Sequence, residues 1–280
     1  MKLFWAETYK IFSRWRTYIS FFVIALIVIL TEVVMKVSAN EIIGRMMRTM
    51  QKDFFIFGNM LNGWFITAFI MNSFHLHIPF FITLVAGDIV SGEATSGTVR
   101  LLLIRPPSRS RIITAKYLAA LLYTTGIVIF LGLLCVLLGL ALFGGGDLIM
   151  NYSTQFRIVF IPEAEIPMRM LFAFMAAIWS MTVITSIAFL FSTLAENSIG
   201  PIIGTMAVVI VFLVLGNFPF DFFRAINPYL FTTHMNIWQR FLDNPIQWRE
   251  IVKSGSILGL HSIALFLIAF ILYRRKDIKS

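Results

Sequence analysis

GDIVSGEATSGTVRLLLIRPPSRSRIITAK, residues 87–116, is polar, rich in Gly and Ser, and basic at its C-terminal end. The chain on either side is almost free of charge: residues 54–87 and 117–146 contain no Lys, Arg, Asp or Glu. A helix needs about 20 apolar residues to cross about 30 Å of hydrocarbon. Each flanking run is long enough to do so, and the polar stretch is therefore predicted to connect two membrane spans.

The composition extends this prediction to the whole chain of 280 residues, of which 59% are hydrophobic and 13% charged, with a mean hydropathy of +0.85. Soluble proteins are about 25% charged. We therefore expect an all-α integral membrane protein that forms one transmembrane domain over residues 1–280. Charge-free runs predict six spans, at about 17–35, 60–86, 117–143, 170–194, 198–217 and 254–273.

Two of these spans carry additional local signals. The second lies in a charge-free run of 34 residues, 54–87, which as one helix would be about 51 Å long, too long for an upright span. Part of it should lie along the interface or project beyond it, and Pro79 can break the helix. The fourth and fifth spans are joined only by the STLAENSIG stretch, which predicts a tight antiparallel hairpin, with Pro201 in the first turn of the fifth.

The distribution of basic residues predicts the orientation. An even number of spans puts both termini on one side, together with residues 86–116 and 195–198. Residues 1–16, 86–116, 195–198 and 274–280 hold 13 Lys and Arg in 58 positions, against 10 in 81 on the other side. The positive-inside rule then places both termini in the cytoplasm, in the inner (cytoplasmic) membrane of a cell. The net charge of +9 points to anionic lipid headgroups rather than to nucleic acid.

Residues 1–16, MKLFWAETYKIFSRWR, form a predicted amphipathic helix. Trp5, Phe12 and Trp15 lie on its apolar arc, whereas Glu7, Lys10 and other polar residues lie opposite. This pattern is typical of a helix in the membrane interface, although an ordinary start to the first span is the alternative. Three basic residues in the C-terminal part of the polar stretch are expected at headgroup depth: Arg109, Arg111 and Lys116.

Several chemistries have no support in the residues. The phosphate-binding pattern G-x-x-x-x-G-K-[ST] is absent, so any use of ATP requires a second protein. His75 and His77 are two residues apart and point to opposite helix faces, which disfavours a metal site. Glu32, near the end of its span, is expected to snorkel to the interface, and Cys135 is expected to be a buried apolar residue. No catalytic constellation is present, and we do not expect an enzyme.

The polar stretch itself predicts a helix from Asp88 to about Ile104 that ends before Pro106-Pro107 and restarts after Ser108 or Ser110 as N-cap. Glu93, Ser96, Gly97 and Arg100 fall on one face of it. Gly92 and Gly97 would let another backbone approach closely. A solvated basic loop explains Arg109 and Arg111, but it does not explain this face.

Residues 87–118 resemble the first cytoplasmic loop of permease subunits of type-2 ABC exporters, whose pattern is E-x-x-x-G-T-x-x-x-L-L-x-x-P-x-S-R followed by a Lys. The positions that match are Glu93, Gly97, Thr98, Leu102, Leu103, Pro106, Ser108, Arg109 and Lys116. The layout of the whole chain is also similar. One departure is the Pro106-Pro107 pair, where a single Pro is more usual.

The resemblance implies an N-terminal elbow helix, a coupling helix that docks on a separate ATPase, and a working unit of two permeases, the same or sister chains, with two ATPase subunits. ATP and Mg²⁺ would be bound by the ATPase, and no cofactor by this chain. The implied contacts with the ATPase are Glu93, Ser96, Gly97, Thr98, Arg100 and Leu103. The cargo would be hydrophobic or amphipathic, such as a drug, a peptide antibiotic or a lipid.

Three alternatives remain at this stage: a membrane anchor or assembly factor that does not transport, an ABC permease that extrudes an ion, and an intramembrane enzyme. Residues 217–253, on the outer side, combine aromatic residues and prolines with few charges. They are expected to form short interfacial helices. These could belong to an exit path for cargo or to an aromatic belt that anchors the last span.

Overall fold

The computed structural model describes residues 1–38, 41, 61–95, 108–152, 157–218 and 220–275. Among them, five helices are long and apolar enough to cross a membrane, and a bent helix pair brings the number to six if it forms one span. The prediction of a helical, multi-pass membrane protein is thereby confirmed. The helices that build the bundle are α1 Lys2–Phe12, α2 Trp15–Val37, α4 Gly63–Ser73, α5 His77–Ala86, α6 Asp88–Thr95, α8 Arg109–Phe143, α9 Ile166–Leu194, α10 Ile199–Asn217 and α13 Trp248–Arg275.

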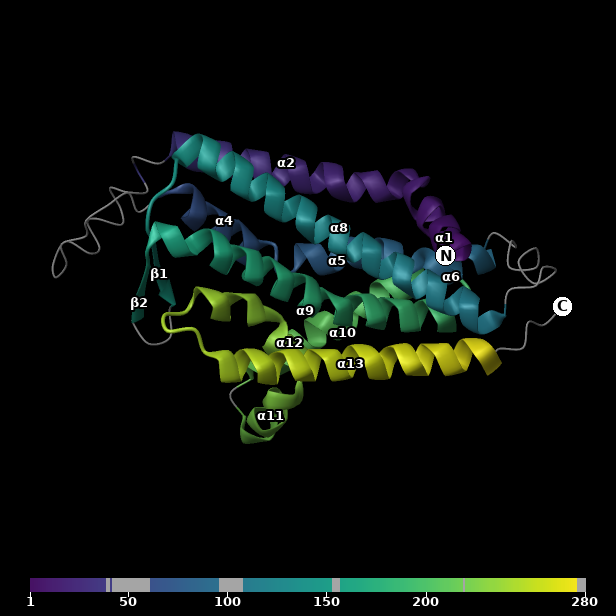
Figure 1. Cartoon of the computed structure of the whole chain (residues 1–280). Helices are drawn as coiled ribbons and strands as arrows, with labels where there is room; N and C mark the ends of the chain where they lie inside the picture. Colours follow the sequence, from purple (N-terminus) through teal and green to yellow (C-terminus); the bar gives the residue numbers. More distant parts are fainter. Residues whose placement is uncertain (39–40, 42–60, 96–107, 153–156, 219, 276–280) are drawn as a thin grey trace.

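The long helices lie side by side along one direction (Figure 1). Helix α1 and the C-terminal end of α13 lie at one end of the bundle, called here the termini end. The opposite end, called the far end, carries a small antiparallel hairpin of β1 (Leu148–Tyr152) and β2 (Arg157–Ile161), in which Leu148 pairs with Ile161. This hairpin is an addition to the all-α prediction.

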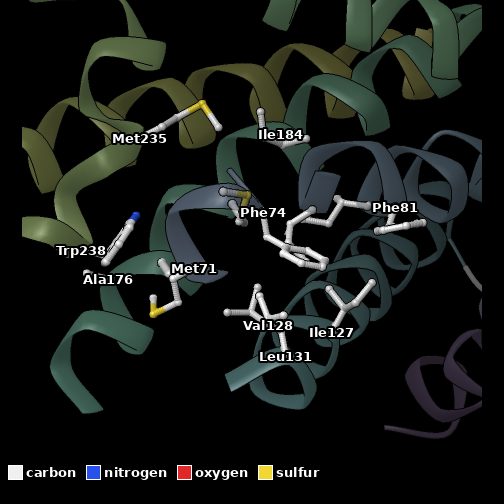
Figure 2. Packing of buried hydrophobic residues seen from close by; sticks show 14 of the residues in the cluster. Met71, Phe74, Phe81, Ile127, Val128, Leu131, Ala176, Ile184, Met235 and Trp238 are labelled. Carbon is white, nitrogen blue, oxygen red and sulfur yellow. The ribbon is translucent and has the colours of Figure 1, made fainter. Parts of the chain in front are cut away.

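Helices α8 and α9 form the centre of the bundle. Helix α8 packs against α1, α2, α4, α5 and α9, and α9 packs against α10 and α13 as well. Of the five single helices that could cross a membrane, the one that contains α9 is the most buried inside the bundle. Figure 2 shows part of the resulting core, in which Met71, Phe74 and Phe81 of the second span belong to one cluster with side chains of α8 and α9.

The second span is bent by 57° between α4 and the helical segment that begins at His77. Pro79 explains the position of the break. It has no N–H to donate to the carbonyl of His75, and its ring would clash with that carbonyl in a continuous helix. The prediction that Pro79 interrupts this run is confirmed, and the bend shortens the distance that the second span covers along the bundle.

Small residues let two helices of the bundle approach to backbone contact. A Cβ placed on Gly63 of α4 would lie 2.5 Å from the carbonyl carbon of Gly139 in α8. Next to this contact, the Thr67 hydroxyl donates to the Gly63 carbonyl at 2.8 Å. Helices in lipid associate through such close packing because no hydrophobic driving force acts between them there.

The far end begins where α8 stops at a run of three glycines. Gly144 and Gly146 have φ values of 74° and 136°, which favour glycine. The N–H of Gly63 donates to the Gly144 carbonyl at 2.9 Å, and the Asn62 amide donates to the Asp147 carbonyl at 2.6 Å. The start of α4 is therefore tied to the exit of α8.

Some predicted boundaries differ from the structure. Helix α8 starts at Arg109, eight residues before the predicted span, directly after Ser108 in the N-cap position. Helix α13 starts at Trp248 rather than at residue 254. The outer segment does form short helices, as expected: α11 Asp221–Ile226, η2 Asn227–Tyr229, α12 Phe231–His234 and η3 Met235–Leu242. The expected end of the polar helix at Pro106-Pro107 lies outside the described residues.

We predict that Gly63→Ala lowers the stability of the bundle by about 1–3 kcal/mol, because the new methyl group has to push α4 and α8 apart. Thermal unfolding of the purified chain in detergent measures this change. Gly126→Ala is the matched control on α8, since a Cβ there meets no atom within 4 Å. It should leave stability unchanged or raise it, because Ala favours a helix. Equal behaviour of the two variants would contradict the proposed backbone contact.

Candidate functional site

The N-terminal helix is docked on the bundle and is not a separate element. Helix α1 packs mainly against α8, and Thr8 and Ile11 are buried in this contact. The chain then turns into α2, and the Thr17 hydroxyl donates to the Ile11 carbonyl across the turn at 2.5 Å. Trp5 and Trp15 are 60% and 75% exposed, so their rings are available to lipid.

Four charged side chains from three segments meet beneath α1. The Lys116 ammonium of α8 lies 2.7 Å from a carboxylate oxygen of Glu7 and 2.7 Å from one of Glu93. The Lys10 ammonium contacts the same two residues, at 2.7 Å from Glu7 and 2.9 Å from Glu93. Glu7, Lys10, Glu93 and Lys116 thus form a closed ring in which each cation touches both anions; we call it the ion ring.

The ion ring is shielded from solvent. The side chains of Glu7 and Lys116 are 1% exposed and that of Glu93 is 8% exposed, whereas Lys10 closes the ring from outside at 41%. Lys116 also donates to the Ile89 carbonyl of α6 at 3.3 Å. Burial lowers the pKa of Lys10, but the hydrogen bonds with Glu7 and Glu93 outweigh it, so that its pKa is raised. All four groups compensate one another, and the ring has no net charge.

A second ion pair holds the beginning of α6. Asp88, the first residue of that helix, pairs with Arg14 and lies 3.6 Å from Arg16. Its negative charge also suits the positive end of the helix dipole. Gly92 leaves the room for it, since a Cβ there would lie 2.5 Å from an Asp88 carboxylate oxygen. The sequence suggested that Gly92 admits another backbone; the structure places an acidic side chain there instead.

Helix α6 is also tied to the end of α9. The N–H groups of Val90 and Ser91 belong to the first turn of α6, where helices leave donors unpaired. Both donate to the Ser192 hydroxyl, at 3.1 and 3.0 Å. As a result, α6 is fixed to α1 and α8 by the ion ring, to the α1–α2 turn by Asp88, and to α9 by Ser192. A displacement of α6 therefore acts on four helices at once.

The predicted site residues fall into two groups. Of the residues assigned to ATPase contact, Glu93 is in the structure, and its carboxylate is paired within the chain; Ser96, Gly97, Thr98, Arg100 and Leu103 lie outside the described residues. Of those assigned to the membrane interface, Trp5, Trp15 and Arg111 are exposed and Phe12 and Arg109 half-buried. Lys116 differs from its expected place at headgroup depth, because its ammonium is buried in the ion ring.

Sequence reasoning missed Glu7, Lys10 and Asp88 as members of this site. Glu7 was placed on the polar arc of α1 that would face water, but it is buried against α8. One available signal was that Glu7 is the only acidic residue among the first 16, in an otherwise basic stretch. Its spacing of three from Lys10 also predicts a pair on one helix face.

Glu32 of α2 also lies in a different environment from the one that we expected. It continues a stripe of buried residues, Thr17, Ser20, Ile24 and Val28, along the face of α2 that packs on α8. The residue is 0% exposed, and neither carboxyl oxygen has a hydrogen-bond partner within the described part of the chain. The expectation that Glu32 snorkels to the interface is therefore wrong, because its side chain points into the α2–α8 contact.

The histidines of the second span do not meet. His77 contacts the Ser73 carbonyl through Nδ1 at 3.0 Å, across the break in the span. Within the ranges that the structure describes, no group of three or more His, Cys, Asp or Glu side chains is arranged to hold a metal ion. Cys135 is buried in α8, in agreement with its expected place in the apolar core.

We predict that substitutions in the ion ring have non-additive effects on the free energy of unfolding. Lys116→Met leaves two buried carboxylates with one cation and should cost about 3–5 kcal/mol. Glu7→Leu combined with Lys116→Met removes one anion and one cation and leaves the Lys10–Glu93 pair. This double variant should recover most of the loss, as measured by unfolding in detergent. A double variant no more stable than Lys116→Met would contradict the direct coupling of Glu7 and Lys116.

We predict that Glu32→Gln leaves the unfolding temperature unchanged or raises it, because a carboxylate buried without a partner costs free energy and the amide has nearly the same size. Glu163→Gln, at an exposed site of the far end, is the control. A clear loss of stability in Glu32→Gln alone would mean that the carboxyl group has a partner that this structure does not include.

Comparison with known proteins places the chain in a family. The chain is 26% identical over 227 residues to "Uncharacterized protein YhcI" of Bacillus subtilis (strain 168), an alignment that covers 78% of this chain and 71% of that protein. Residues 42–279 match the family described as "Protein of unknown function (DUF2705)". Because this match spans most of its length, the chain belongs to that family.

Proposed function

We propose that this chain is the membrane-spanning permease subunit of an ABC exporter, and that α6 begins its coupling helix. The chain would not hydrolyse ATP itself. A separate ATPase, in two copies, would bind ATP and Mg²⁺ and grip the segment that starts at Asp88. Two permeases, identical or sister chains, would complete the unit in the inner membrane, with both termini in the cytoplasm.

The observation that carries this proposal is the way α6 is held. It is a short polar helix at the termini end, and it continues into the stretch that resembles the exporter loop. The ion ring, the Asp88 pair and Ser192 bind it to α1, α8, α2 and α9. Such a helix can transmit a movement of the ATPase to the bundle as a rigid-body shift. Nucleotide binding can bias a transporter between two states in this way.

The ion ring changes the role that we propose for Glu93. Its carboxylate is occupied by Lys10 and Lys116, so we propose that Glu93 positions α6 on the bundle. Direct contact with the ATPase would then fall mainly to the more C-terminal residues of the coupling segment, Ser96 to Leu103. Loss of the Glu93 charge would weaken the coupling between the ATPase and the spans without removing the surface that the ATPase binds.

The nature of the cargo follows from the charges in the spans. Within the described helices, Glu32 is the buried charge that lies inside the limits of a predicted span, close to the end of α2, and the other buried charges lie outside these limits. Ion pathways through membranes generally use several such groups. We therefore propose a hydrophobic or amphipathic cargo, such as a drug, a peptide antibiotic or a lipid.

We predict that the tagged chain, purified from its host in a mild detergent, brings with it a soluble subunit that contains G-x-x-x-x-G-K-[ST]. Glu93→Gln should keep this subunit bound but reduce ATP-dependent transport and the stimulation of ATPase activity, because α6 then loses part of its attachment to the bundle. Glu163→Gln, at the far end, is the control for the loss of one carboxylate and should behave as the parent chain does.

Two results would overturn the proposal. One is purification of an intact chain that never retains an ATPase, which would favour a membrane anchor or assembly factor. The other is labelling of Thr95→Cys in intact cells by a membrane-impermeant maleimide, in a Cys135→Ala background. That result would put α6 outside the cell, where no ATP-driven motor can reach it.

A further inference from the structure

The far end contains a cavity of about 610 Å³ that the coupling site does not involve. Its walls come from η2, α12, η3 and the first turns of α13. A volume of this size falls in the range of small-molecule sites, roughly 300–1,000 Å³. Its polar lining residues include His234, Asn236, Arg240, Asp243, Glu250 and Lys253.

One wall of the cavity is fixed by His234, which is 8% exposed. Its Nε2 lies 2.9 Å from the Pro228 carbonyl and its Nδ1 lies 2.9 Å from the Ser254 hydroxyl. Because a carbonyl can only accept, Nε2 carries the hydrogen, and in the neutral ring Nδ1 accepts from Ser254. The imidazole thereby joins η2, α12 and α13. Both of its ring nitrogens are hydrogen-bonded, so this wall of the cavity is held in place.

Asn236 shapes the wall of this cavity. The backbone at Asn236 departs from helical geometry, with φ −84° and ψ 20°, which kinks η3 at this residue. The kink lies between His234 and Arg240, both of which line the cavity.

The charged groups of the cavity balance one another. Arg240 and Lys253 are basic, and Asp243 and Glu250 are acidic. Arg240 lies 3.6 Å from Asp243, longer than a hydrogen bond, and the Asp243 backbone is anchored by Arg169 of α9 at 2.8 Å. A rim with two charges of each sign suits a molecule that carries both an anionic and a cationic group.

The surroundings of the cavity are apolar and exposed. Tyr229 follows the lining residues Asn227 and Pro228 and is 72% exposed, and Phe222 of the neighbouring α11 is 69% exposed. On the α13 side, Lys253 is followed by a charge-free stretch from Ser254 to Tyr273 of about 30 Å, the thickness of the hydrocarbon core. The cavity thus lies at the level of the lipid headgroups, beside side chains that suit an acyl chain.

We propose that this cavity binds the head of an amphiphile that carries one anionic group and one primary ammonium, as a phosphoethanolamine head does. The anionic group lies by Arg240 and Lys253. The ammonium lies by Glu250 and Asp243 and donates to their carboxylates. A quaternary ammonium has no N–H to donate, and the described residues that line the cavity include no Phe, Tyr or Trp to form an aromatic cage for one. The site is therefore selective for a primary ammonium.

Native mass spectrometry of the whole chain, purified in a maltoside detergent, tests this proposal. The probes are phosphatidylethanolamine, phosphatidylcholine and phosphatidylglycerol with the same acyl chains. We expect phosphatidylethanolamine to bind roughly tenfold more tightly than phosphatidylcholine, as the loss of charge-assisted hydrogen bonds implies. Phosphatidylglycerol, which lacks the ammonium, should also bind weakly. Equal binding of the three lipids would overturn the proposal.

Variants locate the binding. Glu250→Gln should reduce the preference for phosphatidylethanolamine, and Arg240→Gln should reduce its affinity. Arg249→Gln is the matched control, because Arg249 is exposed and adjacent to Glu250 but does not line the cavity. Glu250→Gln alters a rim side chain and is therefore not expected to prevent folding. An unchanged preference in Glu250→Gln would overturn the assignment of the ammonium.

The same measurement identifies the source of the amphiphile. Lipid that stays bound through purification would identify a resident membrane lipid. A cavity that is empty after purification and fills with added lipid would identify an exchangeable ligand, of the kind that a transporter releases. Lipid binding at this cavity requires neither ATP nor an ATPase, so a failure to bind lipid would leave the proposed permease function standing, and the reverse also holds.

Discussion

The buried ammonium of Lys116 is the constraint on which the termini end of the molecule depends. It is 1% exposed, at the edge of an apolar bundle, where an isolated charge would cost several kcal/mol. Glu7 and Glu93 neutralise it, and these residues are separated from it by 109 and 23 positions in the chain. For both to reach Lys116, α1 must lie on α8 and α6 must lie beside them. The ion ring thus fixes the positions of three segments whose apolar surfaces alone would allow other arrangements.

The two ends of the bundle use charge in different ways. At the termini end the charges pair with one another and most of the ion ring is buried, so these charges tie helices together and leave little capacity for a ligand. At the far end, Arg240, Asp243, Glu250 and Lys253 line a cavity. The first arrangement suits the transmission of movement between a partner and the spans, and the second suits the recognition of a polar head. The apolar length between the ends separates these two chemistries.

Much of the fold follows from properties that add up along the chain. The positions of the spans depend on the cost of transferring each residue into hydrocarbon, and this is a local quantity. Pro79 breaks the second span and Ser108 precedes α8 for equally local reasons. The starts of α8 and α13 were missed because a helix can continue into water for several turns without any change that hydropathy detects. Most of the predicted coupling residues, Ser96 to Leu103, lie outside the described residues.

The sequence by itself determined that the chain crosses a membrane, where its spans lie, and that a polar connection follows the second of them. Only the tertiary structure decided that Glu7 faces inward, that Lys116 and Glu93 share a ring, that Glu32 is buried, and that Gly92 makes room for Asp88. A helical periodicity gives the direction of a side chain relative to its own helix axis. It does not say which neighbour lies opposite, and in a membrane protein that neighbour decides whether a charge meets lipid, water or an opposite charge.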